Sequence, residues 1–211
     1  MLSNTPWAVP ALVLLTLASY LIGAFSASIT ISRKMPGGDV RNYGSGNAGA
    51  TNMARIYGMN AGVVTLALDA LKAFICAMVG QWLLGDVGLA VAGAPAIIGH
   101  CYPVYYKFKG GKGVSTGAAL GLALDWRVGL AIIGVFFVVA LLSRKVSLGS
   151  VCAALSLIVF AFAFGFSAPR LALAVFAGVL VVARHHANIK RLLNGTEPDF
   201  KPAKKAEKQK E

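Results

Sequence analysis

The sequence predicts an all-α integral membrane protein, a bundle of about seven transmembrane helices of which some are short. Hydrophobic residues fill 57% of the 211 positions, charged residues only 13%, and the mean hydropathy is +0.69. A water-soluble domain of this length could not hide so much apolar surface, whereas a bilayer accepts it. The apolar residues also fall into separate runs, several of them close to the roughly 20 residues that a helix needs to cross a membrane.

The first apolar run, residues 8–31, is expected to remain as a permanent membrane helix. A secretory signal peptide would be shorter and would begin with basic residues, whereas here Arg33 and Lys34 follow the run directly. Turns at residues 85–86, 125–126 and 167–169 separate the later runs. The later spans are expected at residues 62–84, 87–104, 114–124, 128–142, 148–166 and 171–183.

Two of these runs are short for a membrane crossing. As helices, residues 114–124 would reach only about 16 Å and residues 128–142 about 22 Å, against about 30 Å of hydrocarbon. Either these helices extend into the neighbouring polar segments, or a polar mouth cuts into the membrane beside them. Counting both as spans gives seven crossings, and merging them gives five or six.

The positive charge indicates how the bundle is oriented. The chain has 20 Lys and Arg against 8 Asp and Glu, a net charge of +12. A nucleic-acid partner is not expected, because the cations lie in short segments between apolar runs, as loops beside anionic membrane lipids do. With the N-terminus outside and the C-terminus cytoplasmic, all cations are inside except Arg127, Arg170 and the intramembrane Lys72. One polytopic domain is expected over residues 1–200, followed by a disordered basic tail, 201–211.

The first of three unusually polar inner segments covers residues 44–55. It reads Gly-Ser-Gly-Asn-Ala-Gly-Ala-Thr-Asn-Met-Ala-Arg. Glycines let backbone N–H groups approach an anion, and short hydroxyl and amide side chains add donors. Because helix-forming residues resume at Ala54, we expect the segment to end at a helix N-terminus, which favours phosphate. A flexible Gly/Ser/Asn linker is the alternative interpretation.

The second polar segment covers residues 99–113 and also runs into an apolar helix. It contains Gly-His-Cys-Tyr-Pro and then Phe-Lys-Gly-Gly-Lys-Gly. Free amides, a helix dipole and the Lys112 ammonium could meet there on one phosphate. Because Gly113 follows Lys112 where a Walker A loop needs Ser or Thr, ATP or GTP binding is not predicted. A loose turn is the alternative, with Lys107 and Lys109 only marking topology.

The third polar segment, residues 184–197, begins where the last span leaves the membrane. On a continuing helix, Arg184, Asn188 and Arg191 share one face, and His185 lies three residues from Asn188. Histidine is the natural proton acceptor near neutral pH. A basic helix that only anchors the chain to lipid is the alternative interpretation.

Asp69 and Lys72 lie three residues apart inside the second span. Ionisable groups at membrane depth normally pair with each other or face a cavity. A structural ion pair and a role at the substrate cavity are both consistent with this spacing.

Together the three segments resemble the signature of the acyl-phosphate:glycerol-3-phosphate acyltransferase family, known as PlsY. The agreement in order and spacing extends from about residue 8 to residue 200, and the co-occurrence of three motifs makes it specific. The family pattern Gly-Ser-Gly-Asn-x-Gly-x-Thr-Asn with a later Arg matches residues 44–52 and Arg55. Gly-His-x-x-Pro and Phe-x-Gly-Gly-Lys-Gly-Val match 99–103 and 108–114, and Arg-His-x-x-Asn-Ile, Arg-Leu and Gly-x-Glu match 184–189, 191–192 and 195–197.

The resemblance implies a bacterial inner-membrane enzyme with its active site facing the cytoplasm. It would move an acyl chain from acyl phosphate to the 1-hydroxyl of glycerol 3-phosphate, giving lysophosphatidic acid and inorganic phosphate, the first step of phospholipid synthesis. An acyl-phosphate-forming enzyme would supply the donor. Lysine and arginine can stabilise the phosphates without a metal or cofactor, and none is expected. The cysteines, Cys76, Cys101 and Cys152, lie in or beside apolar runs and are expected to pack in the core.

The resemblance also implies residue roles. The expected catalytic residues are Ser45, Arg55, His185 and Asn188, with His185 and Asn188 orienting the attacking hydroxyl and either His185 or a substrate phosphate taking its proton. The first segment would hold one phosphate and residues 110–113 the glycerol phosphate, while Glu197 could instead pair structurally with a basic residue. The expected substrate-binding residues are Gly44, Gly46, Asn47, Gly49, Thr51, Asn52, His100, Lys107, Gly110, Gly111, Lys112, Gly113, Arg184 and Glu197.

A lipid or anion transporter is the main rival from another class. It would show inverted repeats, and none is visible, while all three polar segments fall on one side. Acyltransferases with a His-x4-Asp motif are excluded, because Tyr105, Lys190 and Arg191 stand where the Asp would be. A CDP-alcohol phosphotransferase needs a cluster of aspartates that this sequence lacks. A purely structural membrane protein leaves the three motifs unexplained.

Overall fold

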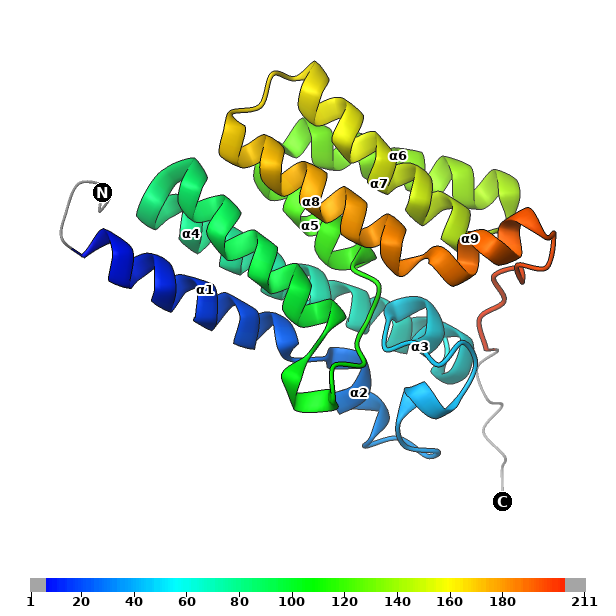
Figure 1. Ribbon diagram of the computed structural model, residues 1–211. Coiled ribbons are helices and arrows are strands. Elements are labelled where there is room, and N and C mark those ends of the chain that lie inside the picture. The colour runs from blue at the N-terminus through cyan, green and yellow to red at the C-terminus, as the bar shows by residue number, and fades with distance from the viewer. Residues whose placement is uncertain (1–6, 204–211) are drawn as a thin grey trace.

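The computed structural model describes residues 7–203, and this part of the chain folds into helices joined by turns and loops (Figure 1). The α-helices pack as a bundle, and short 3-10 helices, η2 and η3, lie in two of the loops. The expected tail therefore lies mostly outside the described residues. The helices are α1 (Ala8–Ala24), α2 (Ala27–Ser32), η2 (Val40–Asn42), α3 (Ala50–Tyr57), α4 (Met59–Cys101), η3 (Val104–Tyr106), α5 (Val114–Leu124), α6 (Trp126–Ser143), α7 (Val146–Ala163), α8 (Ala168–Arg184) and α9 (His186–Leu193).

Helix α4 is a helical hairpin. Its backbone leaves helical geometry at Leu84 and Gly85, where Gly85 has φ +62°, a conformation that glycine adopts readily. The two arms then pack so closely that a Cβ on Gly80 would lie 2.2 Å from the carbonyl oxygen of Gly88. The turn that the sequence predicts at residues 85–86 is confirmed.

Every apolar run of the sequence is helical over most of its length, as predicted. Among residues 7–203, four helical segments are long and apolar enough to cross a membrane, and the bent pair α8–α9 makes a fifth if it is counted as one span. One of the four includes the α4 hairpin, which doubles back on itself. The 18-residue α6 extends beyond its predicted run to about 27 Å, whereas the 11-residue α5 remains at about 16 Å. The protein is thus a multi-pass membrane protein, and the count of seven crossings and the orientation of the termini stay predictions.

The first apolar run is not one continuous helix, contrary to expectation. It breaks between α1 and α2, where Phe25 is extended and the Ser26 side chain caps α2 by accepting a hydrogen bond from the Ile29 amide. The break frees the Phe25 carbonyl, which accepts a hydrogen bond from Lys72 Nζ at 2.5 Å. The break therefore supplies a hydrogen-bond acceptor for the Lys72 ammonium, which α4 carries.

The Asp69–Lys72 ion pair ties this break to both arms of α4. Lys72 Nζ lies 2.8 Å from Asp69 Oδ1 and 3.3 Å from Nδ1 of His100 on the second arm, and Asp69 is fully buried. Since neither Asp69 nor Lys72 lines the cavity described below, the structure supports the ion-pair interpretation rather than a role at the substrate cavity.

The two ends of the bundle differ in the polar residues that they carry. At one end Arg170 pairs with Asp86 and Arg127 pairs with Asp125. The three polar segments lie at the other end, around α2, α3 and α9 (Figure 1). The glycine-rich loops thus lie at the end of the bundle opposite these two ion pairs, where the site was predicted.

Candidate active site

A cavity of about 360 Å³ opens among the three polar segments. Residues from each of them line it, although they are far apart in the chain. The predicted site residues that line the cavity are Ser45, Asn47, Gly49, Thr51, Asn52, Arg55, His100, Lys112, His185, Asn188 and Glu197. The structure therefore brings together most of the residues that the sequence singled out.

Asn52 gives the first polar segment its shape. Its Nδ2 donates to the carbonyls of Val40, Tyr43 and Asn47 at 3.0–3.1 Å. Its Oδ1 accepts a hydrogen bond from the Ser45 amide at 3.0 Å. Because this buried amide is occupied by the loop's own backbone, Asn52 positions the loop rather than offering a free donor to phosphate.

Helix α3 presents its N-terminus to the cavity. It begins at Ala50 after Gly49, four residues before the position expected from the sequence, so Thr51 lies in its first turn and Arg55 in its last. The first amides of a helix have no partner within it and attract anions. The side chains of Ser45, Thr51 and Arg55 form no hydrogen bond or ion pair with any residue between 7 and 203, which leaves these donors available to a ligand.

The glycines of the second segment let the loop lie directly against the end of α4. The Gly111 amide donates to the His100 carbonyl at 3.0 Å. A Cβ on Gly111 would lie 2.1 Å from His100 Nε2, so a larger residue fits only if the loop or the His100 ring moves. Gly113 then starts α5 with φ +86°, and the N-terminal residues Val114 and Ser115 of α5 line the cavity. A second helix N-terminus thus faces the same space.

Lys112 is held by a chain of polar contacts that reaches the third segment. Its Nζ donates to Asn188 Oδ1 at 2.5 Å, and Asn188 Nδ2 donates to Glu197 Oε1 at 2.7 Å. Glu197 also pairs with Arg191 through a 2.7 Å contact, which confirms the structural pairing considered for it. Both ends of the Asn188 amide are used, so Asn188 orients Lys112.

Several cations share this region. Burial, followed by the charge of Arg191, lowers the pKa of Lys112 from 10.5 to about 8, although Glu197 acts in the opposite direction. The charges of Arg184 and Arg55 also contribute to the lowering. A group of cations that destabilise one another would be stabilised by a bound anion.

His185 stands at a bend, not inside the continuous helix that the sequence predicted. Helices α8 and α9 meet there at 59°. His185 Nδ1 lies 2.7 Å from the Val181 carbonyl oxygen, which can only accept a hydrogen bond, so Nδ1 carries the proton. In the neutral ring Nε2 is then the acceptor. The side chain is buried and lines the cavity, so an unprotonated nitrogen is available there.

Some predicted residues lie beside the cavity without lining it. Lys107 is an exposed residue in the loop after η3, so we leave it out of the site. Arg184 donates to the Gly111 carbonyl at 3.1 Å and stacks on the Tyr102 ring, and thus supports the second segment. The remaining predicted residues outside the lining are the loop glycines Gly44, Gly46, Gly110, Gly111 and Gly113.

Ser147 and Ser150 line the cavity and were missed by sequence reasoning. They lie in the first turns of α7, and Ser147 Oγ is buried without a hydrogen-bond partner in the described part of the chain. Two serines three residues apart at the start of an apolar run were the available signal. Beyond them the cavity becomes apolar, between α5, α6, α7 and α8; its lining there includes Leu122, Ile133, Phe136, Leu157 and Val181.

The fold and site define a multi-pass membrane protein that can hold anionic head groups next to an apolar slot. A family model described as glycerol-3-phosphate acyltransferase matches residues 13–195. The glycerol-3-phosphate acyltransferase of Syntrophotalea carbinolica is 45% identical, with 89% of this chain and 97% of that protein covered, and that of Dinoroseobacter shibae is 42% identical, with 89% and 92% covered. This chain belongs to the glycerol-3-phosphate acyltransferase family, and the resemblance found in the sequence is confirmed.

Solved structures agree with this assignment. The crystal structure of PlsY, an integral membrane glycerol 3-phosphate acyltransferase, in its glycerol 3-phosphate form is 38% identical, with a TM-score of 0.87 over 90% of this chain and 96% of that chain. The lysophosphatidic acid form of the same enzyme gives a TM-score of 0.84 at 37% identity.

Proposed function

We propose that the protein transfers an acyl chain from acyl phosphate to the 1-hydroxyl of glycerol 3-phosphate, producing lysophosphatidic acid and inorganic phosphate. One observation carries this proposal: two helix N-termini and two cations, Arg55 and Lys112, line a single cavity that continues into an apolar slot. Two phosphates and one acyl chain are what the two substrates of this reaction bring. The solved PlsY structures, one in a glycerol 3-phosphate form and one in a lysophosphatidic acid form, support the acceptor and the product.

The donor phosphate is assigned to the first segment. Ser45, Thr51 and Arg55 line the cavity, with Thr51 in the first turn of α3 and Arg55 in its last. Within residues 7–203 their side-chain donors have no other partner, so they are free for this phosphate. Arginine can hold a phosphate through two parallel hydrogen bonds. The acyl chain would then extend between α5, α6, α7 and α8, where the cavity lining is apolar.

The acceptor phosphate is assigned to Lys112 and the N-terminus of α5. In this proposal the 1-hydroxyl faces the donor's carbonyl carbon and lies near His185. The hydroxyl oxygen bonds to that carbon, the bond from the carbon to the phosphate oxygen breaks, and its electron pair leaves with the phosphate. His185 Nε2 accepts the hydroxyl proton, with a phosphate oxygen as the competing acceptor.

Positioning and charge stabilisation supply the catalysis in this proposal. Arg55 and the α3 amides stabilise the phosphate as it leaves, and the shared cavity holds both reactants close together. The cationic end of the bundle supports a cytoplasm-facing site in the bacterial inner membrane. The donor would come from an enzyme that forms acyl phosphates.

The test is an assay with purified protein, palmitoyl phosphate and glycerol 3-phosphate, without CoA or added metal. The proposal predicts one phosphate released for each lysophosphatidic acid formed, and no product from palmitoyl-CoA. Product from palmitoyl-CoA alone would contradict the donor assignment. Movement of glycerol 3-phosphate across liposomes without phosphate release would instead favour a transporter.

A further inference from the structure

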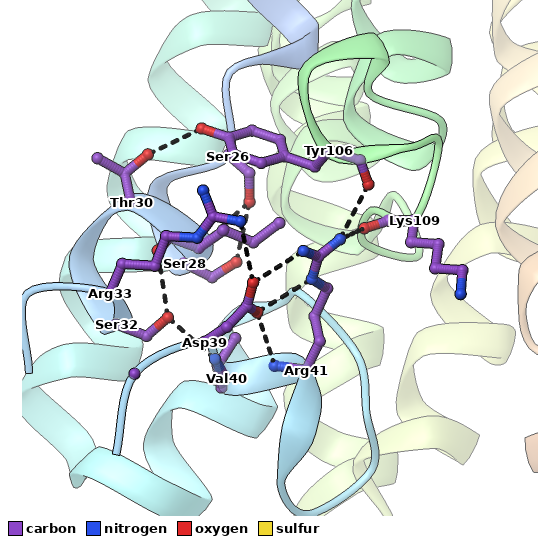
Figure 2. A network of polar contacts seen from close by, with 12 residues as sticks. Ser26, Ser28, Thr30, Ser32, Arg33, Asp39, Val40, Arg41, Tyr106 and Lys109 are labelled. Atoms are coloured by element: carbon purple, nitrogen blue, oxygen red, sulfur yellow. Dashed lines mark hydrogen bonds and ion pairs between the residues drawn. The ribbon is translucent and has the colours of Figure 1, made fainter. Parts of the chain in front are cut away.

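Arg41 lies in η2, just before the first polar segment, and contacts the second polar segment. Figure 2 shows the Arg41 guanidinium beside the backbone of Tyr106 and Lys109, which belong to the second segment. Arg41 Nη1 donates to the Tyr106 carbonyl at 2.9 Å and to the Lys109 carbonyl at 3.1 Å. The Lys109 carbonyl comes directly before Gly110, so the contacts fix the start of the glycine-rich loop that carries Lys112.

Asp39 holds Arg41 in the orientation that this bridge needs (Figure 2). Arg41 Nε donates to Asp39 Oδ1 at 3.0 Å, and Nη2 donates to Oδ2 at 2.8 Å. The Arg41 amide also donates to Oδ1 at 3.1 Å. The hydrogen bond from Arg41 is the main cause that lowers the pKa of Asp39, against the effect of burial. The pair therefore stays ionised at neutral pH.

The turn that carries Arg41 is held in place by hydrogen bonds to Val40 and by burial of the Val40 side chain. The Val40 amide donates to Ser32 Oγ at 3.0 Å, and the Val40 side chain is fully buried (Figure 2). The Val40 carbonyl accepts a hydrogen bond from Asn52 Nδ2, the amide that shapes the first segment. Arg41 thus stands on a turn that Asn52 ties to the first segment, whose donors are assigned to the leaving phosphate.

The chain contains an internal comparison at the other end of the bundle. Asp125 and Arg127 repeat the local geometry of Asp39 and Arg41: the Arg127 amide, Nε and Nη2 donate to the carboxylate at 2.8, 3.0 and 2.7 Å. The Arg127 side chain, however, is 57% exposed and donates to no carbonyl of a second segment within residues 7–203. The local Asp-x-Arg pair therefore forms without a bridge, and the two Nη1 contacts distinguish Arg41.

We propose that Arg41, oriented by Asp39, is a positioning residue that holds the Lys112 loop against the first segment and so sets the affinity for glycerol 3-phosphate. This inference rests on the proposed function of the cavity. Arginine suits the role because its planar fork can bind the carboxylate on one side and two carbonyls on the other, which a lysine ammonium cannot do at once.

The test compares Arg41→Gln, Arg41→Lys and Asp39→Asn with Arg127→Gln as the matched control. In the palmitoyl phosphate assay, Arg41→Gln is expected to raise the KM for glycerol 3-phosphate about tenfold or more, the effect of losing hydrogen bonds from a charged group. Arg41→Lys and Asp39→Asn should raise it by less. The KM for palmitoyl phosphate should change less than about threefold, because α3 keeps its own contacts. Arg127→Gln should leave both KM values within about twofold of wild type.

KM is the chosen measurement because it does not depend on the fraction of active protein, which a purely structural defect would lower. Glycerol 3-phosphate KM values within twofold of wild type in folded Arg41→Gln would overturn the inference. If Arg41→Gln does not fold, unchanged KM values in Arg41→Lys and Asp39→Asn would overturn it equally. An inactive wild-type protein would instead count against the proposed function.

Discussion

Lys112 Nζ lies 2.5 Å from Asn188 Oδ1, although the two residues come from different polar segments. The contact joins the glycine-rich loop before α5 to the short helix α9. Asn188 links Lys112 to Glu197, because Asn188 Nδ2 donates a hydrogen bond to the Glu197 carboxylate. An acid and a lysine are thereby linked through a neutral amide, which orients the lysine without pairing its charge.

Asn188→Ala should therefore lower activity strongly, although it removes only one small side-chain amide. The substitution removes the acceptor that aligns Lys112 and takes one donor from the buried Glu197. We expect kcat/KM for glycerol 3-phosphate to fall about 100-fold, the effect of two lost hydrogen bonds to charged groups. Asn194→Ala is the control, because Asn194 is an exposed residue at the end of α9. Equal activity of the two variants would mean that the contacts of Asn188 with Lys112 and Glu197 have no role in activity.

The lowered pKa of Lys112 predicts a pH dependence of acceptor binding. A pKa of about 8 means that the ammonium is lost at a lower pH than in a free lysine. The affinity for glycerol 3-phosphate, if it depends on this charge, should be highest below about pH 8. It should fall about tenfold per pH unit well above that pH. The measurement is the KM for glycerol 3-phosphate from pH 7 upward. In Lys112→Arg the KM should stay flat over the same range, because arginine remains charged.

His185→Gln tests the assignment of the proton acceptor. The variant removes Nε2 as a base, and kcat should fall about 100-fold or more if His185 takes the hydroxyl proton. His186→Gln is the matched control, because His186 is the exposed neighbour. Near-normal turnover of His185→Gln would transfer the role to a phosphate oxygen of the substrate.

Gly111→Ala tests the close approach of the second segment to α4. Its Cβ would lie 2.1 Å from His100 Nε2, so either the loop or the histidine ring must move. We expect a loss of about 1–3 kcal/mol in stability and a large loss of acceptor affinity. Gly134→Ala, at a site on α6 with open space around the added methyl, should change neither property. Thermal unfolding in detergent and the KM for glycerol 3-phosphate measure the two effects.

The helices could be predicted from the sequence because the bilayer constrains them so strongly. A long apolar run can satisfy its backbone in lipid only as a helix. The break at Phe25 could not be predicted, since it accommodates the Lys72 ammonium from another helix. The bend at His185 was missed similarly, because the residues around it show no helix-breaking signal.

The candidate site was predictable as a set of residues but not as a set of contacts. Glycines, hydroxyls and cations at motif spacing indicated where anions would bind. The sequence could not show that the amides of Asn52 and Asn188 serve the protein's own groups, because this depends on tertiary distances. Arg41 counted only as an inner cation, and its bridge to Tyr106 and Lys109 appears only in three dimensions.

The most direct test of the account asks whether Arg55 and Lys112 hold different phosphates in one cavity. The KM values for palmitoyl phosphate and glycerol 3-phosphate would be measured for Arg55→Gln and Lys112→Gln in the same assay. Arg55→Gln should raise the donor KM about tenfold or more with a smaller effect on the acceptor, and Lys112→Gln should show the reverse pattern. Activity in which neither substitution changes either KM would contradict the account.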